Sequence, residues 1–199
     1  IFQTKLLPMK RRIVGSITMV LIMMTIVCCE DLFKNELGKN ENISQFIDLD
    51  SILKRNIKNL QNRKLNKEVL LDGRKEEMNF ISDTILLAGD FGLFEDINIG
   101  RPTFIGEYDI VEQDGVEIYN RKGKKGPQEL ILKKGKNNEL IQIEAKQLES
   151  NMLYNSRLNY LLKFDSSTAE ITEYKFFGYQ KLIFKDTVFF SVFGKFESN

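Results

Sequence analysis

The chain has no histidine and no tryptophan, and its only two cysteines, Cys28 and Cys29, are adjacent. Without histidine, serine–histidine and cysteine–histidine catalytic pairs and histidine-ligated metal centres are excluded. Adjacent cysteines rarely bridge because such a disulfide is strained, so a disulfide framework and a cysteine-rich zinc site are excluded too. We therefore predict a protein that is not an enzyme, with no catalytic residue, no metal ligand and no cofactor.

The remaining composition is that of a globular protein. The 199 residues are 42% hydrophobic and 29% charged, which suits one domain with a tail. Residues 1–28 contain four basic residues and no acidic one, so the rest of the chain has 25 basic (29 minus 4) against 28 acidic residues, a net charge of −3. A nucleic-acid partner normally requires a clear basic excess and is not predicted.

The amino terminus has the pattern of an export signal. Met9-Lys10-Arg11-Arg12 is a basic run, and the fifteen residues from Ile13 to Val27 carry no charge. As a helix this stretch is about 22 Å long at ~1.5 Å per residue, whereas a membrane span needs about 20 residues. It therefore fits the apolar region of a secretory signal. Residues 1–8, which precede the first methionine, are interpreted as an upstream artefact.

The apolar run ends in Ile26-Val27-Cys28-Cys29, which resembles the lipobox of bacterial lipoproteins. In that family the cysteine receives a diacylglyceryl group, the signal is cut before it, and the new amine is acylated. The resemblance predicts a lipoprotein signal peptide over residues 1–28 and lipidation at Cys29, with Cys28 as the alternative because it would place bulky Val27 before the cut. Two acyl chains hold a protein stably on a membrane. An ordinary cleaved signal and an uncleaved anchor remain alternatives.

Residues 29–42 are polar and predict a tether, and residues 43–199 predict a single globular domain. Its first segment, Ile43–Asn62, has apolar residues at helical spacing and predicts one amphipathic helix capped by Asn42 or Ser44. We expect this helix to pack on the rest of the domain. A helix on a membrane surface or a partner is the alternative.

After residue 66 the pattern changes to that of strands. Asp114-Gly115 predicts a tight hairpin, and residues 135–138 and 165–167 predict two further turns. The stretch Thr187–Phe193 is apolar on both faces and predicts an interior strand or one covered by the helix. The late aromatic residues predict core packing. The strands are expected at 68–71, 78–88, 103–112, 116–120, 129–133, 139–147, 152–164, 170–177 and 182–193.

These elements predict an α+β fold: one N-terminal amphipathic helix packed on a mainly antiparallel β-sheet. Few helical stretches separate the strands, so repeated βαβ units are not indicated. An antiparallel sheet of this length is expected to fold as a sandwich or to curve into a barrel.

Two acidic patterns could suggest chemistry. Gly89-Asp90-Phe91-Gly92 contains the kinase Asp-Phe-Gly letters, but the catalytic-loop motif of that family needs a histidine. We interpret it as a turn after a strand. Asp90, Glu95 and Asp96 form a small acidic group, interpreted as a solvated loop rather than as a catalytic pair or a cation site.

Two basic runs, residues 121–126 and 133–136, together contain seven basic residues. If 129–133 is one strand, the runs lie at its opposite ends, about 17–20 Å apart at ~3.3 Å per residue. We expect two solvated turns, with lysines that protect strand edges. One joint anion- or glycan-binding patch is the alternative.

Composition and leader together point to a source. The chain has 21 Lys, 21 Ile, 16 Asn and 3 Ala, a bias typical of AT-rich bacterial genomes. With Met9-Lys10-Arg11-Arg12 and the Cys29-Glu-Asp-Leu-Phe-Lys start of the mature chain, it resembles the outer-surface lipoproteins of Borrelia spirochetes. The specific resemblance covers residues 9–40.

The resemblance implies a protein anchored by lipid in the bacterial outer membrane and exposed on the cell surface. Its predicted partners are the membrane, through the anchor, and a host protein or glycan. The predicted function is a binding module or antigen that contacts host molecules, through ligand-binding residues that the sequence does not identify. The alternative is an envelope lipoprotein that carries a small apolar ligand in a β cavity, and a hydrolase is least favoured.

Overall fold

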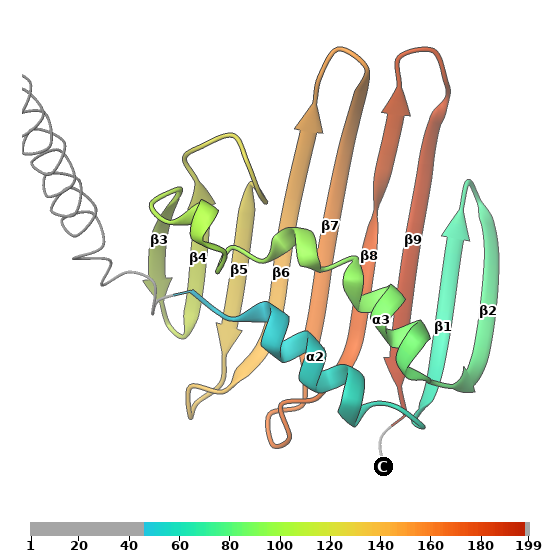
Figure 1. The fold of residues 1–199 in the computed structure, drawn as a ribbon, viewed down its shortest axis with the longest axis vertical. Helices are drawn as coiled ribbons and strands as arrows, with labels where there is room; N and C mark the ends of the chain where they lie inside the picture. Colours follow the sequence, from blue (N-terminus) through green and yellow to red (C-terminus); the bar gives the residue numbers. More distant parts are fainter. Residues whose placement is uncertain (1–45, 198–199) are drawn as a thin grey trace, which may run out of the picture. The chain divides into compact units, whose positions relative to one another are not determined.

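A computed structural model describes residues 46–197, which form one antiparallel sheet and two helices. Helix α2 spans Leu49–Asn59 and helix α3 spans Thr84–Gly92. Two short 3-10 turns, Glu95–Ile97 and Pro102–Phe104, continue the crossing segment that starts with α3. This segment leads from one edge of the sheet to the other (Figure 1).

The sheet has nine strands in the order β2-β1-β9-β8-β7-β6-β5-β4-β3, all antiparallel to their neighbours. From β3 to β9 each strand pairs with the next in the chain, and only the β1–β9 pair joins distant segments. The strands are β1 (Lys64–Leu71), β2 (Arg74–Ile81), β3 (Tyr108–Gln113), β4 (Val116–Arg121), β5 (Glu129–Lys134), β6 (Leu140–Ser150), β7 (Tyr154–Phe164), β8 (Ile171–Leu182) and β9 (Thr187–Phe196).

The predicted turns are confirmed. Asp114 and Gly115 both have positive φ, 51° and 75°, as a two-residue hairpin between β3 and β4 requires. The turns at 135–138 and 165–167 join β5 to β6 and β7 to β8. Strand β9 lies between β1 and β8, so Thr187–Phe193 is part of an interior strand, as its apolar pattern predicts.

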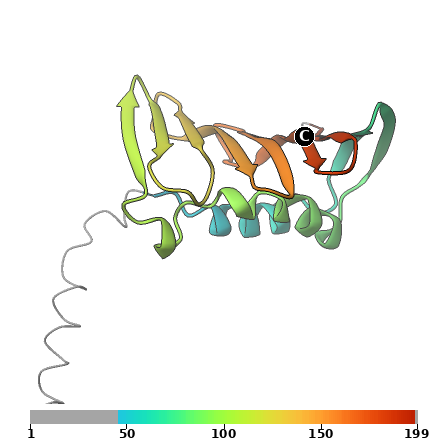
Figure 2. The ribbon, with the colours of Figure 1, turned by 90° about the horizontal axis from the view of Figure 1, so that it is seen from above.

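Both helices cover the same face of the sheet (Figure 2). Alternate strand residues point towards them, so each strand contributes every second side chain to one core. Residues that pair across the sheet, such as Leu162 with Tyr174 and Ile143 with Leu162, lie on this covered face. The most deeply buried large side chains include Leu49, Leu60, Leu65, Leu87, Phe91, Phe94, Ile97, Ile99, Tyr119, Leu130, Leu132, Leu162 and Tyr174.

Helix α2 confirms the predicted amphipathic helix and its packing on the domain, with corrected ends. Phe46 and Ile47 are not helical, and Asp48 caps the helix by accepting a hydrogen bond from the Ser51 amide at 3.1 Å. The predicted caps, Asn42 and Ser44, lie outside the described residues. The Asp48 side chain gives an acceptor to a first-turn amide that has none within the helix, which favours a helix start at Leu49.

Several fold predictions are wrong. The strand expected at 103–112 begins only at Tyr108, after a 3-10 turn, and the one expected at 182–193 begins only at Thr187, after the β8–β9 turn. Strand 78–88 ends at Ile81, because Asp83 caps a second helix that runs through Gly92 and accepts from the Leu86 amide at 2.8 Å. Apolar residues 85–87 therefore belong to a helix, and a short apolar run does not distinguish the two structures. The sheet also stays open: β2 and β3 are free edges of the described residues, and no barrel or second sheet forms. The helices cover the one face that a second sheet would have covered.

Candidate functional site

The face of the sheet that the helices leave uncovered is the best candidate for a binding surface. Figure 2 shows both edges of the sheet curving away from the helices, so that this face is concave. The side chains on it are those that alternate with the core residues. An antiparallel sheet normally keeps one face in solvent, and that face then carries mainly polar residues. Here the polar residues are interrupted by aromatic and aliphatic side chains.

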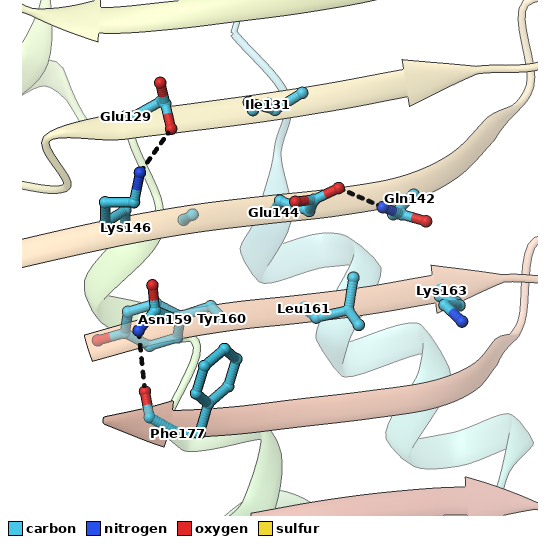
Figure 3. A pocket seen from close by; sticks show the side chains of 11 residues that line it. Glu129, Ile131, Gln142, Glu144, Lys146, Asn159, Tyr160, Leu161, Lys163 and Phe177 are labelled. Atoms are coloured by element: carbon cyan, nitrogen blue, oxygen red, sulfur yellow. Dashed lines mark hydrogen bonds and ion pairs between the residues drawn. The ribbon is translucent and has the colours of Figure 1, made fainter. Parts of the chain in front are cut away.

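A hollow of about 280 Å³ lies on this face, over strands β5 to β8. Figure 3 views it from the uncovered side: Glu129 and Ile131 lie on one strand, and Asn159, Leu161 and Lys163 lie together on another. Ile131, Leu161 and Phe177 supply apolar side chains to its lining. Asn159 donates from Nδ2 to the Phe177 carbonyl oxygen at 3.4 Å (Figure 3). The other side chains of the uncovered face that line it are Glu129, Gln142, Glu144, Lys146 and Lys163. Tyr160 also borders the hollow, but its side chain is buried on the covered face, against Phe94 and Phe176.

The charges around the hollow are paired with one another. The Lys146 ammonium lies 3.2 Å from Glu129, and that of Lys133 lies 2.6 Å from Glu144. The hydrogen bond from Lys133 lowers the pKa of Glu144 below its usual value, and burial opposes this shift. Both carboxylates are therefore partnered, and the hollow presents charge of both signs with little net field. Such a floor suits a partner that also carries both signs.

An aromatic strip continues the hollow across β8 and β9. Tyr179 and Phe189 face each other across the strand pair, with ring centroids 6.0 Å apart. The Lys175 ammonium lies 4.8 Å from the Phe177 ring centroid, a cation–π contact. Arg157 is directly opposite Tyr179 on β7. Phe189 is 57% exposed and Phe177 is 37% exposed. The strip thus offers rigid aromatic surface next to cationic groups, a frequent composition of binding hot spots.

The late aromatic residues are therefore not all core residues, which corrects the prediction. Phe176, Phe190 and Phe196 lie on the covered side, whereas Phe177 and Phe189 lie on the uncovered side. Adjacent phenylalanines in one strand must point to opposite faces. The doublets at 176–177 and 189–190 therefore indicate that one phenylalanine of each pair is outside the core, if only one face of the sheet is covered.

A second polar cluster lies beneath α3. The Lys67 ammonium on β1 is 2.6 Å from Asp90 on α3, and the Tyr174 hydroxyl on β8 donates to the other carboxylate oxygen of Asp90. The Asp90 and Lys67 side chains are 11% and 13% exposed, and Tyr174 is fully buried. Burial, followed by the hydrogen bond to Asp90, raises the pKa of Tyr174 far above its usual value. The cluster keeps the tyrosine neutral and joins α3 to the sheet.

The prediction that Asp90 lies in a solvated loop is therefore wrong. The segment Gly89–Gly92 is the last part of α3 and not a turn after a strand. Its helical position turns Asp90 inward, whereas Glu95 and Asp96 in the next 3-10 turn are exposed. The three carboxylates do not gather, and residues 46–197 contain no cluster of three acidic side chains suited to a metal. Lys67 and Tyr174, the partners of Asp90, were missed because they lie far away in sequence.

The two basic runs lie at opposite ends of β5, as predicted. Residues 122–128 precede this strand and 135–138 follow it. Lys133 and Lys134, however, belong to the strand itself, where they pair with Glu144 and Glu117. The hydrogen bonds from Lys134 and Tyr119 hold the pKa of Glu117 below its usual value against the opposing effect of burial, which is the largest single influence.

The predictions for the leader fall on residues that are not described. Cys29, the alternative Cys28, the signal peptide at 1–28 and the tether at 29–42 all lie outside residues 46–197. Within residues 46–197, neither helix has the length and apolar content needed to cross a bilayer. Comparison of the chain with models of known protein families, with curated proteins and with solved structures finds no match.

Proposed function

We propose that the protein is a lipid-anchored bacterial surface lipoprotein that binds a host molecule through the uncovered face of its sheet. The observation that carries this proposal is the concave face itself, with aromatic residues between paired charges. A sheet that exposes Phe177 and Phe189 leaves apolar area in contact with water, and such patches mark interaction sites. The anchor rests on the lipobox-like sequence before Cys29.

A protein partner suits this face best. The ion pairs Lys146–Glu129 and Lys133–Glu144 leave charge of both signs on the floor, which favours a partner surface with complementary charges of both signs. The aromatic strip provides rigid area for the centre of an interface, where Tyr, Trp and Phe are enriched. The alternative, a carrier for a small apolar ligand, would need an enclosed apolar cavity, and an open sheet does not close around a ligand.

The binding test compares two faces of the same domain. The double variant Phe177→Ser/Phe189→Ser removes the exposed aromatic area of the uncovered face. The matched control Ile85→Ser removes a side chain that is 84% exposed on α3, on the opposite side. Binding of the chain to purified host plasma and matrix proteins, presented one at a time, gives the affinities. We expect the double variant to bind at least about tenfold more weakly and Ile85→Ser to bind unchanged. Equal loss in both variants would contradict the proposal.

The anchor and the location need separate tests. Labelled palmitate should enter the wild-type chain and fail to enter Cys29→Ala, and label that persists in Cys29→Ala would assign the anchor to Cys28 or exclude it. Protease added to intact cells should remove a surface-exposed chain. Protection of the chain until the outer membrane is opened would place it in the periplasm and contradict surface display.

A further inference from the structure

Two hairpin turns at one end of the sheet expose apolar side chains that neither the core nor the uncovered face uses. The β6–β7 turn carries Met152 and Leu153, which are 89% and 69% exposed. The β8–β9 turn carries Ile183 and Phe184, which are 57% and 92% exposed. Turn positions usually take glycine, asparagine or aspartate, so four large apolar residues at two neighbouring turns need another reason. We call these four residues the apolar tip.

The apolar tip is held in place by hydrogen bonds. The Ile183 amide donates to the Leu153 carbonyl oxygen at 3.0 Å and so joins one turn to the other. Asn151 accepts from the amides of Leu153 and Tyr154 at 2.8 and 3.0 Å. Both hairpins extend past the helices in the same direction (Figure 1), so both turns can touch one plane at once. The apolar tip is therefore a projecting, ordered surface and not a groove.

Lysines surround the apolar tip. Lys185 is within the β8–β9 turn, and Lys181 is on β8 just before it. Lys124 and Lys125, in the loop before β5, line a common hollow with Asn151 of the β6–β7 turn. None of these four lysines has an ion-pair partner among residues 46–197. Two acidic residues also lie near the apolar tip: Asp186 in the β8–β9 turn, and Glu149, which lines the same hollow and accepts a hydrogen bond from the Tyr154 hydroxyl.

We propose that the apolar tip inserts into an anionic phospholipid bilayer, the one that also holds the anchor of the chain. A projecting apolar end with lysines set behind it matches the order of layers in a membrane, where acyl chains lie beneath anionic headgroups. The apolar ring of Phe184 suits insertion at the boundary between headgroups and acyl chains. A protein pocket would need to receive two separate turns at once, whereas a bilayer accepts any projecting apolar surface.

That the apolar tip enters the same bilayer as the anchor rests on the proposed function, whereas insertion of the apolar tip into an anionic bilayer does not. An acyl anchor alone lets the domain turn freely on the membrane, whereas an anchor together with the inserted apolar tip holds the domain at a fixed orientation. The hollow lies over β5 to β8 and is lined by none of the residues of the two turns, so insertion of the apolar tip leaves it open to a partner.

The absence of tryptophan makes a direct test available, since one introduced tryptophan is the only one in the chain. We place it in the full acylated chain as Phe184→Trp, and the matched control is Phe177→Trp. Phe177 is five residues before the end of β8, so it lies roughly 17 Å from that end at ~3.3 Å per residue. Each variant is reconstituted into vesicles of phosphatidylcholine and phosphatidylglycerol with brominated acyl chains. We expect the emission of Phe184→Trp to shift to the blue and lose intensity, and that of Phe177→Trp to stay unchanged.

Three further arms make the outcome decisive. Vesicles of phosphatidylcholine alone, or the added changes Lys181→Glu and Lys185→Glu, should reduce the quenching of Phe184→Trp. Brominated lipid supplied only in a second, protein-free vesicle population should not quench it. Flotation with the vesicles reports the anchor independently of the apolar tip. An anchored Phe184→Trp chain that is not quenched, equal quenching of Phe177→Trp, or quenching from the second population alone overturns the proposal.

Discussion

Removing the Asp90 carboxylate should destabilise the protein more than any surface substitution, because two buried groups depend on it. The Lys67 ammonium is 2.6 Å from one oxygen of Asp90, and the Tyr174 hydroxyl donates to the other. In Asp90→Ala, a charge that is 13% exposed and a fully buried hydroxyl both lose their acceptor. Breaking a buried ion pair from one side costs about 3–5 kcal/mol, a large part of a typical stability of about 5–15 kcal/mol.

Companion variants separate the charge from the packing. Tyr174→Phe leaves the ion pair intact and removes one hydrogen bond, so we expect a loss of about 1–2 kcal/mol. The double variant Lys67→Met/Asp90→Leu replaces both charges by apolar groups and should recover the part of the loss that comes from the unpaired lysine. The Tyr174 hydroxyl still lacks its acceptor in this variant, so its share of the loss should remain. Asp96→Ala removes an exposed carboxylate six residues away and should change stability by less than about 0.5 kcal/mol.

Urea unfolding followed by circular dichroism measures these differences, with the slope of the transition checked for each variant. The reasoning is refuted if Asp90→Ala unfolds at the same urea concentration as Asp96→Ala. It is also refuted if Lys67→Met/Asp90→Leu is less stable than Asp90→Ala, because the unpaired charge would then not be the cause.

Three further predictions follow from single contacts. Asn56→Leu removes the side-chain acceptor, 2.7 Å away, of the buried Ile171 amide; we expect a loss of about 1–3 kcal/mol and faster hydrogen exchange at that amide. Gly194→Ala places a methyl group 2.1 Å from the Tyr174 ring and should cost about 1–3 kcal/mol in urea unfolding, whereas Gly89→Ala, with nothing within 4 Å, should be neutral or slightly stabilising. Hydrogen bonds from Ser167, followed by Thr168, lower the pKa of the Asp165 carboxyl to about 2 from an ordinary 3.8. Because the pKa of Asp165 is lower in the folded state than in the unfolded state, the contribution of this carboxyl to stability is present above pH 3.8 and is lost as the pH falls towards 2. Carbon NMR titration of the carboxyl should give the lowered midpoint. A midpoint near 3.8 would show that the hydrogen bonds of the turn do not lower this pKa.

The sequence determined the local structure of most strands. Alternating side chains and turn residues such as Asp114-Gly115 act over a few residues, and they locate most of the strands. The strands expected at 103–112 and 182–193 begin later, at Tyr108 and Thr187. The pattern was insufficient where a short apolar run could form either structure. Residues 85–87 became helical because Asp83 caps them and because α3 has a sheet surface to cover.

Other features depend on contacts between distant segments, and only the tertiary structure decided them. In the sequence, nothing near Asp90 shows which residues it contacts. In the folded domain, α3 places it against Lys67 on β1 and Tyr174 on β8. Phe177 and Phe189 read as core residues until both helices are found on one face, which leaves the other face open. Local patterns fix which side chains share a face of a strand. Which face is covered depends on the free energy of packing whole elements together, and no short stretch of sequence contains it.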